Sequence, residues 1–470
     1  MSNLHSRAVF TIGFVSLAVL ASFAPFHAQA PRPVDLIVAN GIVLTMDAER
    51  RVVSPGSVAV SGSSIVAVGP ADAIARDYLA KDTIEARGRV VMPGLINTHT
   101  HAPMVLYRGL GDDLALMDWL QKYIFPAEAK TVSPEFVRTG TRLAALEMIR
   151  SGTTTYVDMY YFEEEIARAT KEAGLRGVLG QSIIEFPVSD AKTPTDALAR
   201  AEAFIKQYRQ DDLIVPAVAP HSVYTLDAST LKQARDLAAR YSVPVLIHLA
   251  ETEAENGLSQ QRHKARPVAA LTALGFWGPQ VIAAHGVWIQ PDEIAVLLKQ
   301  GVGVSHNPES NMKLASGTAP VVEYLKAGVA VGLGTDGAAS NNDLDMFEAM
   351  RQAAFLHKLT SKDPRAVSAR AALEMATIGG ARVIGRETQL GSLETGKLAD
   401  LIVVRMDRAR QTPMYDPISH LVYVTRGDDV ETVIVNGRTL MRDRRVLTLD
   451  EADVLSDARK AADQVRAAVK

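Results

Sequence analysis

Eight short apolar segments recur along the middle of this chain, and each is followed by a stretch rich in alanine, leucine and charged residues. Short apolar runs bounded by turn residues are typical of buried strands, and the longer stretches between them are typical of helices. Eight such units over roughly 290 residues predict a closed (β/α)8 barrel, which usually needs about 250 residues. An open, doubly wound α/β sheet is the alternative. The expected strands are residues 94–101, 153–160, 177–184, 214–221, 244–251, 281–288, 301–308 and 329–337.

Both flanks of this region have a different, β-rich pattern. Residues 31–92 alternate β-branched and polar residues around Asn-Gly and Ser-Gly pairs, which are typical of hairpins. A similar pattern returns in residues 388–450, so we expect the two flanks to build one small β domain beside a barrel at residues 93–387. Residues 451–470 predict a C-terminal amphipathic helix.

Residues 1–30 are typical of a secretory signal peptide. Arg7 precedes an apolar run from Ala8 to about Ala24, and Ala28-Gln29-Ala30 has the small-x-small form of a cleavage site. An uncleaved membrane anchor is the alternative, because the run is close to the length that spans a bilayer. We therefore expect an exported, periplasmic protein whose mature chain begins at Pro31; without a working signal, it would be cytoplasmic.

The amino-acid composition limits the classes of molecule that this protein is expected to bind. Charge is nearly balanced, with 50 basic and 53 acidic residues, and no basic stripe is interleaved with aromatic residues. We therefore expect a small-molecule substrate, no nucleic acid and no stable membrane association after signal cleavage, and we leave open whether copies form a homo-oligomer. The chain has no cysteine, so any metal must be held by His, Asp or Glu.

The carboxyl ends of the expected strands carry most of the informative polar side chains. His99 and His101 end the first strand, and the period of two along a strand directs both to one face. In a barrel the strand ends meet at one mouth, where catalytic residues gather. A single buried histidine is usually a core residue, but the convergence of so many predicts a metal site. The other strand-end residues are His221, His248, His285, His306 and Asp336.

We expect His99, His101, His248 and Asp336 to bind one divalent metal ion. Three imidazoles and one carboxylate suit zinc, and iron or manganese would also be tolerated. A second ion would need a bridging group such as a carbamylated lysine, and "IVPAVAPHSVY" contains no lysine. A bound ion would lower the pKa of a coordinated water to about 7 and supply hydroxide at neutral pH.

The proton transfers need further side chains. Glu251 follows His248 by three residues and lies just past the strand end, where its carboxyl can carry a proton to the substrate. A solvated loop glutamate is the alternative for this residue. Asp336 can accept the proton of the attacking water, and His285 is placed to stabilise a developing oxyanion or to orient the water.

Five ordered motifs carry a family resemblance over about residues 33–445: "PGLINTHTHAPM", "HLAETEAE", "AAHGVW", "HNPESNMKLASG" and "GTDGAASNNDLDMFEAMR". They resemble the amidohydrolase superfamily, and most closely its 5′-methylthioadenosine/S-adenosylhomocysteine deaminases. The resemblance implies the same four metal ligands and makes Glu251 the proton shuttle. It further implies that Glu128 holds the ribose hydroxyls and that His221 contacts the purine. By spacing alone, Glu128 would be a charge on a helix surface and His221 one more histidine at the mouth.

The reaction we expect is hydrolytic deamination of an aminopurine nucleoside to the inosine-type product and ammonia. The substrate would be 5′-methylthioadenosine, adenosine or S-adenosylhomocysteine. Alternatives are another deaminase of the superfamily, a hydrolase of cyclic amides or triazines with an exported substrate, and a catalytically silent binding protein.

The loop after the third strand bears on substrate choice. Relatives that accept S-adenosylhomocysteine resemble one another in presenting arginine to its carboxylate from this loop. Here Lys192 is the only basic residue between Arg176 and Arg200. A lysine lacks the planar fork that binds a carboxylate bidentately. We therefore expect adenosine or 5′-methylthioadenosine to be the better substrate.

Overall fold

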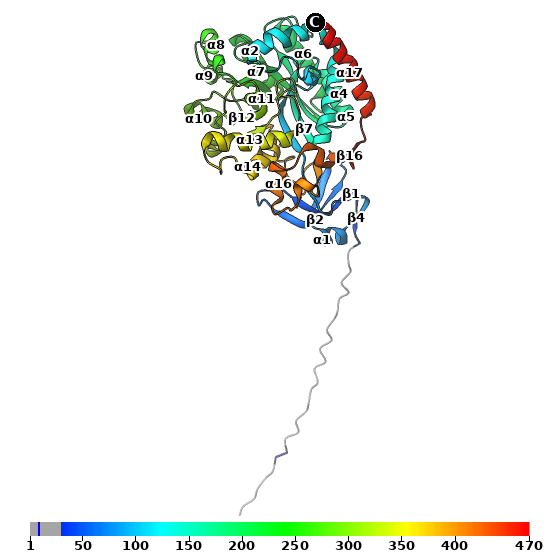
Figure 1. Ribbon diagram of the computed structural model, residues 1–470. Helices are drawn as coiled ribbons and strands as arrows, with labels where there is room; N and C mark the ends of the chain where they lie inside the picture. The colour runs from blue at the N-terminus through cyan, green and yellow to red at the C-terminus, as the bar shows by residue number, and fades with distance from the viewer. Residues whose placement is uncertain (1–7, 10–29, 470) are drawn as a thin grey trace, which may run out of the picture.

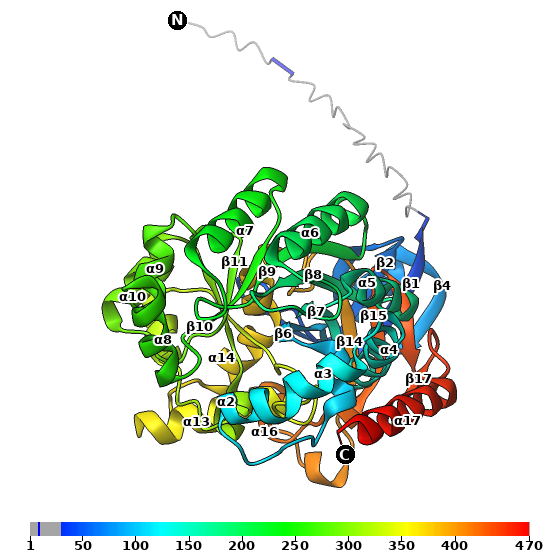
Figure 2. The same cartoon turned by 90° about the horizontal axis from the view of Figure 1, so that it is seen from above.

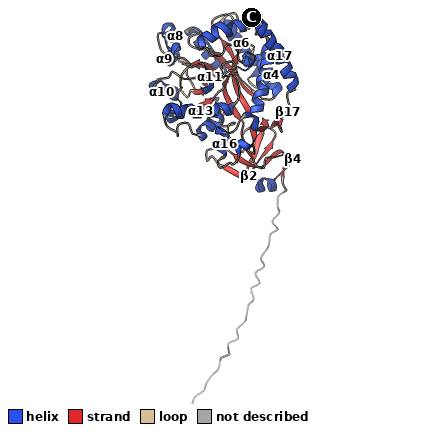
Figure 3. Ribbon diagram, viewed as in Figure 1, coloured by secondary structure: helices blue, strands red, loops and turns tan. Residues whose placement is uncertain are grey.

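The computed structural model describes residues 8–9 and 30–469, and its larger part is a barrel of eight parallel strands (Figure 1). Each strand pairs with the next along the chain, from β6 to β13, and the helices lie outside them (Figure 3). The predicted α/β barrel is confirmed, and the open, doubly wound sheet is excluded. The strands are β6 (Leu95–Thr100), β7 (Thr153–Tyr160), β8 (Arg176–Ile183), β9 (Ile214–Pro220), β10 (Val245–Leu249), β11 (Val281–His285), β12 (Gly303–His306) and β13 (Val331–Leu333).

Side-chain and backbone hydrogen bonds join the last strand to the first and so close the barrel. The Asn97 side-chain amide donates to Thr335 Oγ1 at 2.7 Å, and the Thr335 backbone N–H returns a bond to Asn97 Oδ1 at 3.1 Å. The Asp336 N–H donates to the His99 carbonyl at 3.0 Å. These bonds place the end of β13 beside the end of β6, and therefore Asp336 beside His99.

The strands are buried on both faces, as expected when helices cover the outside. In β10, Leu246 packs into the barrel interior, while its neighbours Val245 and Ile247 pack outward into the main helix-covered core. The lower end of the interior is filled by Ala381 and Val383 of α15 (Gly380–Val383). The upper end is left for polar residues.

The helices of the barrel form a ring around the strands (Figure 2). Their ends carry the expected signals: Ser133 caps α4 with Pro134 at its first position, and Gly152 ends it with φ 89°. The principal helices are α4 (Pro134–Ser151), α5 (Glu163–Ala173), α6 (Pro194–Tyr208), α7 (Ala228–Tyr241), α8 (Glu253–His263), α9 (Pro267–Ala273), α10 (Pro291–Lys299), α12 (Val321–Ala327), α13 (Met346–Ser361) and α14 (Ala369–Glu374).

The two chain flanks share a second sheet of nine strands below the barrel (Figure 1). Its halves meet where β5 and β14 pair antiparallel, with Met92 opposite Ile402. The predicted composite β domain is thus confirmed, while its exact boundaries at residues 92 and 388 stay predictions. The strands are β1 (Arg32–Leu44), β2 (Val52–Ser61), β3 (Ser64–Pro70), β4 (Tyr78–Glu85), β5 (Arg89–Pro93), β14 (Leu401–Arg405), β15 (Val430–Val435), β16 (Arg438–Arg442) and β17 (Arg445–Val446).

A buried ion pair ties the barrel to this sheet. Arg176 Nε lies 3.0 Å from Asp400 Oδ2 and its Nη2 lies 3.2 Å from Asp400 Oδ1, so the pair is bidentate. Asp400 Oδ1 also accepts the Asn436 N–H at 2.7 Å. Both charges therefore have their hydrogen-bonding partners, as burial requires.

The structure describes the C-terminal helix but only three of the first 30 residues. The helix expected at residues 451–470 is α17 (Glu451–Ala468), which packs along α4 and is capped by Asp450 (Figure 2). The signal-peptide prediction falls outside the described residues, apart from residues 8, 9 and 30. Among the described residues, no helix combines the length and apolar character that crossing a membrane requires.

Candidate metal and active site

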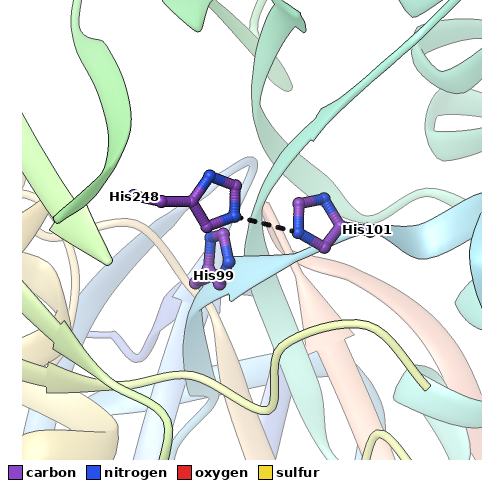
Figure 4. Close-up of side chains that lie close together, drawn as sticks. All are labelled: His99, His101 and His248. Carbon is purple, nitrogen blue, oxygen red and sulfur yellow. Dashed lines mark hydrogen bonds between the residues drawn. The ribbon is translucent and has the colours of Figure 1, made fainter. Parts of the chain in front are cut away.

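Three imidazoles converge at the mouth of the barrel (Figure 4). His99 and His101 come from the end of β6, and His248 from β10 on the other side of the mouth. His101 Nε2 and His248 Nε2 lie 3.3 Å apart. His99 and His101 therefore lie together, as expected, and His248 joins them as the predicted third histidine.

Asp336 completes this cluster. Its Oδ1 lies 3.3 Å from His99 Nε2 and 3.4 Å from His101 Nε2. Burial alone would raise the pKa of Asp336, but the facing imidazoles of His99, His285 and His101 hold that pKa well below its usual range. The carboxyl is therefore ionised at neutral pH, as a metal ligand must be.

Backbone carbonyls orient two of the imidazoles. His101 Nδ1 lies 2.7 Å from the Met159 carbonyl, and His248 Nδ1 lies 2.8 Å from the His221 carbonyl. A carbonyl only accepts, so each Nδ1 carries a proton and each Nε2 directs a lone pair into the cluster. These contacts are the usual support of metal-binding histidines.

His99 provides a direct test of whether a cation fits. Its Nε2 is buried and makes no hydrogen bond with any described atom. A buried nitrogen without a partner is costly, and a metal ion at the centre of the cluster would satisfy it. Burial also lowers the pKa of His99 to about 4, so its imidazole is neutral and free to bind. The donor set of His99, His101, His248 and Asp336 therefore suits a divalent cation.

Glu251 and His285 lie next to the cluster. Glu251 is only 5% exposed, so the alternative of a solvated loop residue does not hold. Its Oε2 lies 3.9 Å from His285 Nε2, and burial raises the pKa of its carboxyl. Burial disfavours the charged form of His285, but the carboxylates of Glu251 and Asp336 outweigh it and raise the pKa of that imidazole. Glu251 therefore retains its proton more readily than a free glutamate, and His285 retains its proton more readily than a free histidine.

Glu128 and His221 line the same cavity. Glu128 lies on α3 (Phe125–Thr131), and spacing alone would have made it a surface charge, yet its carboxylate is buried and accepts from Tyr160 Oη at 2.5 Å. Burial raises the pKa of Glu128 to about 7. The His221 ring centroid lies 4.6 Å from that of His248, and burial lowers the pKa of His221 to about 3. The structure thus brings Glu128 and His221 to the same mouth as Glu251, His285 and the predicted metal ligands.

The rest of the cavity wall is largely apolar. Among the described residues that line it, there is no lysine or arginine. The cavity therefore combines a few polar groups with a mostly apolar wall, which is typical of small-molecule sites. The apolar side chains are those of Met104, Leu116, Trp119, Leu120, Ile124, Phe125, Met159 and Leu314.

His306 does not join the site, although it ends β12. Ser305 Oγ lies 2.6 Å from Thr98 Oγ1, so the next side chain points the other way, toward α13. There His306 Nε2 lies 3.0 Å from His357 Nε2. The expectation that every strand-end histidine faces the mouth is wrong for this residue.

Several supporting side chains had not been predicted. Asp336 Oδ2 accepts from Ser310 Oγ at 2.6 Å and from Ser340 Oγ at 2.8 Å. Asn311 Oδ1 accepts from His285 Nδ1 at 2.9 Å. Ser310 and Asn311 belong to α11 (Pro308–Lys313), within the quoted motif "HNPESNMKLASG". The family resemblance pointed to this segment, but hydroxyl and amide groups have no spacing that reveals what they orient.

Comparison with known proteins identifies the family to which this chain is similar. The model of the Amidohydrolase family matches residues 90–440. The 5-methylthioadenosine/S-adenosylhomocysteine deaminase of Syntrophobacter fumaroxidans is 48% identical over 432 residues, covering 92% of this chain and 98% of the relative. The 5′-deoxyadenosine deaminase of Methanosarcina mazei is 45% identical over 437 residues, covering 93% of this chain and 99% of the relative.

Solved structures also match. An adenosine deaminase from Xanthomonas campestris with bound zinc superposes with a TM-score of 0.91 at 39% identity, covering 93% of this chain and 100% of its own. An atrazine chlorohydrolase from Arthrobacter aurescens, complexed with zinc, has a TM-score of 0.84 at 26% identity and covers 91% of this chain and 100% of its own.

Proposed function

This chain belongs to the amidohydrolase family, and we propose that it is a metal-dependent deaminase of 6-aminopurine nucleosides. The observation that carries the proposal is the position of Glu251, a buried carboxyl that lines a mostly apolar cavity together with His101, His248 and Asp336 of the predicted metal site. Relatives that are 43–48% identical over most of the chain are named as deaminases of such nucleosides, which supports the assignment.

We propose that one divalent ion, zinc in preference to iron or manganese, is held by His99, His101, His248 and Asp336. Zinc suits three imidazoles and one carboxylate, and the similar adenosine deaminase structure contains zinc. When bound, such an ion would supply a water made acidic enough to act as a nucleophile at neutral pH.

The protein side chains then manage the protons. Glu251, whose pKa is raised by burial, donates a proton to the purine ring nitrogen while the oxygen of water adds to C6. The proton released by the water passes to Asp336 or His285 and then to the departing amino group. The bond between C6 and the amino nitrogen breaks and ammonia leaves. The second proton of the water returns from the C6 hydroxyl to Glu251, and the ring keeps the oxygen as the 6-oxo group of an inosine-type product.

The nucleoside is held by residues around this centre. Glu128 accepts hydrogen bonds from the ribose hydroxyls, and Tyr160 fixes its carboxylate by donating to Oε1. His221 lies against His248 and contacts the purine. Apolar side chains such as Trp119 and Phe125 exclude water from the rest of the ligand.

A substrate panel tests the proposal. The mature chain, with its metal content measured, should release ammonia from adenosine, 5′-deoxyadenosine or 5′-methylthioadenosine. Turnover restricted to triazines or cyclic amides would instead favour another hydrolase of the family. Nucleoside binding without ammonia release from a metal-loaded protein would indicate a binding protein.

Glu251→Gln tests the role of the proton carrier. Because glutamine cannot transfer a proton, kcat should fall by about 100-fold or more while KM and bound metal are retained. Glu253→Gln, which makes the same change at an exposed position nearby, is the matched control. Loss of metal from Glu251→Gln would make this residue a ligand, and wild-type turnover would remove it from the mechanism.

A further inference from the structure

We propose that Glu255 is a positioning residue whose carboxylate holds the turn that aims Glu251 at the substrate; the inference rests on the proposed function. Glu255 lies on α8, one helical turn beyond Glu251, and is 1% exposed. It is not among the residues that line the cavity, so it acts through Glu251 and not on the substrate.

The two oxygens of Glu255 each accept one backbone N–H from the turn. Oε1 accepts from Ala250 and Oε2 accepts from Glu251, both at 2.9 Å. A glutamate at this helical position usually reaches back to the N-cap residue, which here is Thr252. Glu255 instead reaches further back, to the turn that links β10 to α8.

This turn has a conformation that needs support. Ala250 has φ 49°, in the left-handed region that residues other than glycine seldom adopt. Its carbonyl accepts from the N–H groups of Val287 and Trp288 at 3.1 and 2.9 Å. The turn is therefore held from both sides, by the loop after β11 and by the Glu255 carboxylate. Releasing the Glu255 side would free the Glu251 backbone to rotate.

Only a carboxylate offers two acceptors in this fork geometry. In Glu255→Gln, the amide nitrogen would confront one of the two backbone N–H groups, because both are donors. We expect kcat to fall by about tenfold or more, with KM within about threefold and bound metal unchanged. Glu253→Gln, at an exposed position of the same helix, should leave kcat at the wild-type value.

A double-mutant comparison separates positioning from general stabilisation. If Glu255 acts through Glu251, adding Glu255→Gln to Glu251→Gln should lower kcat by less than about twofold further. Equal losses in both backgrounds would overturn the inference. If Glu255→Gln does not fold, Glu255→Asp can replace it, because aspartate keeps both acceptors on a shorter side chain. It should lower kcat in the wild-type background but not lower it further in the Glu251→Gln background.

Amide hydrogen exchange gives a readout that does not depend on activity. The Ala250 and Glu251 amides should exchange faster in Glu255→Gln and at the wild-type rate in Glu253→Gln. Unchanged exchange in Glu255→Gln would overturn the inference. If the wild-type protein releases no ammonia from any nucleoside, the proposed function fails, and the exchange measurement alone decides whether Glu255 holds the turn.

Discussion

Replacing His101 or Asp336 by alanine removes one donor from the proposed metal site. The remaining side chains cannot satisfy a divalent ion, so we expect metal affinity and kcat/KM to fall by at least about 100-fold while the barrel still folds. Metal content after dialysis, measured by mass spectrometry, and circular dichroism check this. His420→Ala, on α16 (Pro417–Tyr423) away from the mouth, is the control. Full metal content and turnover in both variants would refute the site.

Glu128→Gln should weaken nucleoside binding but stabilise the protein at alkaline pH. The pKa of Glu128 is raised to about 7 from an ordinary 4.5, because the carboxyl is buried. Between these values the folded protein holds a proton that the unfolded chain releases, so the free energy of unfolding falls as pH rises. Above pH 7 the full cost is on the order of 3 kcal/mol, and glutamine removes it.

Thermal unfolding at two pH values checks this prediction. The Tm of Glu128→Gln should exceed that of the wild type by more at pH 8.5 than at pH 5.5, and its KM for the nucleoside should rise. Glu135→Gln, at an exposed position on α4, should change Tm equally at both pH values. A Tm difference for Glu128→Gln that is independent of pH would contradict the argument.

At the scale of elements, the loop between β8 and α6 governs the expected substrate preference. Its one lysine, Lys192, is exposed. Arg200 on α6 is bound to Glu164 at 2.7 Å and lies 3.2 Å from Asp190, so its guanidinium is already engaged. These contacts agree with the expectation that the loop offers no arginine to a substrate carboxylate.

We therefore predict that adenosine or 5′-methylthioadenosine is turned over better than S-adenosylhomocysteine. A missing charge-assisted contact is worth about 1.5–3 kcal/mol, which corresponds to roughly ten- to a hundredfold in kcat/KM. Side-by-side kcat/KM values decide this. If S-adenosylhomocysteine is preferred, Arg262→Gln becomes the informative variant, because Arg262 pairs with Glu185 near the mouth and could exchange that partner for the substrate carboxylate.

At the scale of the whole molecule, we propose that residues 1–30 direct export and are then removed. Residues 1–35 fused to a reporter that is active only outside the cytoplasm should give activity, and the mature chain should begin at Pro31. The same fusion without residues 8–24 should be inactive, because it lacks the apolar run. A cytoplasmic protein that starts near Met1 would refute the proposal.

Local pattern in the sequence was enough to predict the barrel and the convergence of His99, His101, His248 and Asp336 at its mouth. Apolar segments that alternate with helical stretches predict parallel strands, and the carboxyl ends of such strands must meet at one mouth. Because a strand has a period of two, His99 and His101 had to share a face. The same rule placed His248 and Asp336 at the mouth together with His221 and His285, but it failed for His306.

The tertiary structure alone decided which of these side chains are buried together and what supports them. Glu128 was expected on a helix surface from its spacing, but the packing of α3 over the mouth buries it against Tyr160. His306 ends a strand like the others, yet the direction of Ser305 turns it toward His357. The contacts of Glu255 depend on the turn that joins β10 to α8. Burial and hydrogen-bond partners arise from elements far apart in the chain, and the periodicity of one segment carries no information about its neighbours in space.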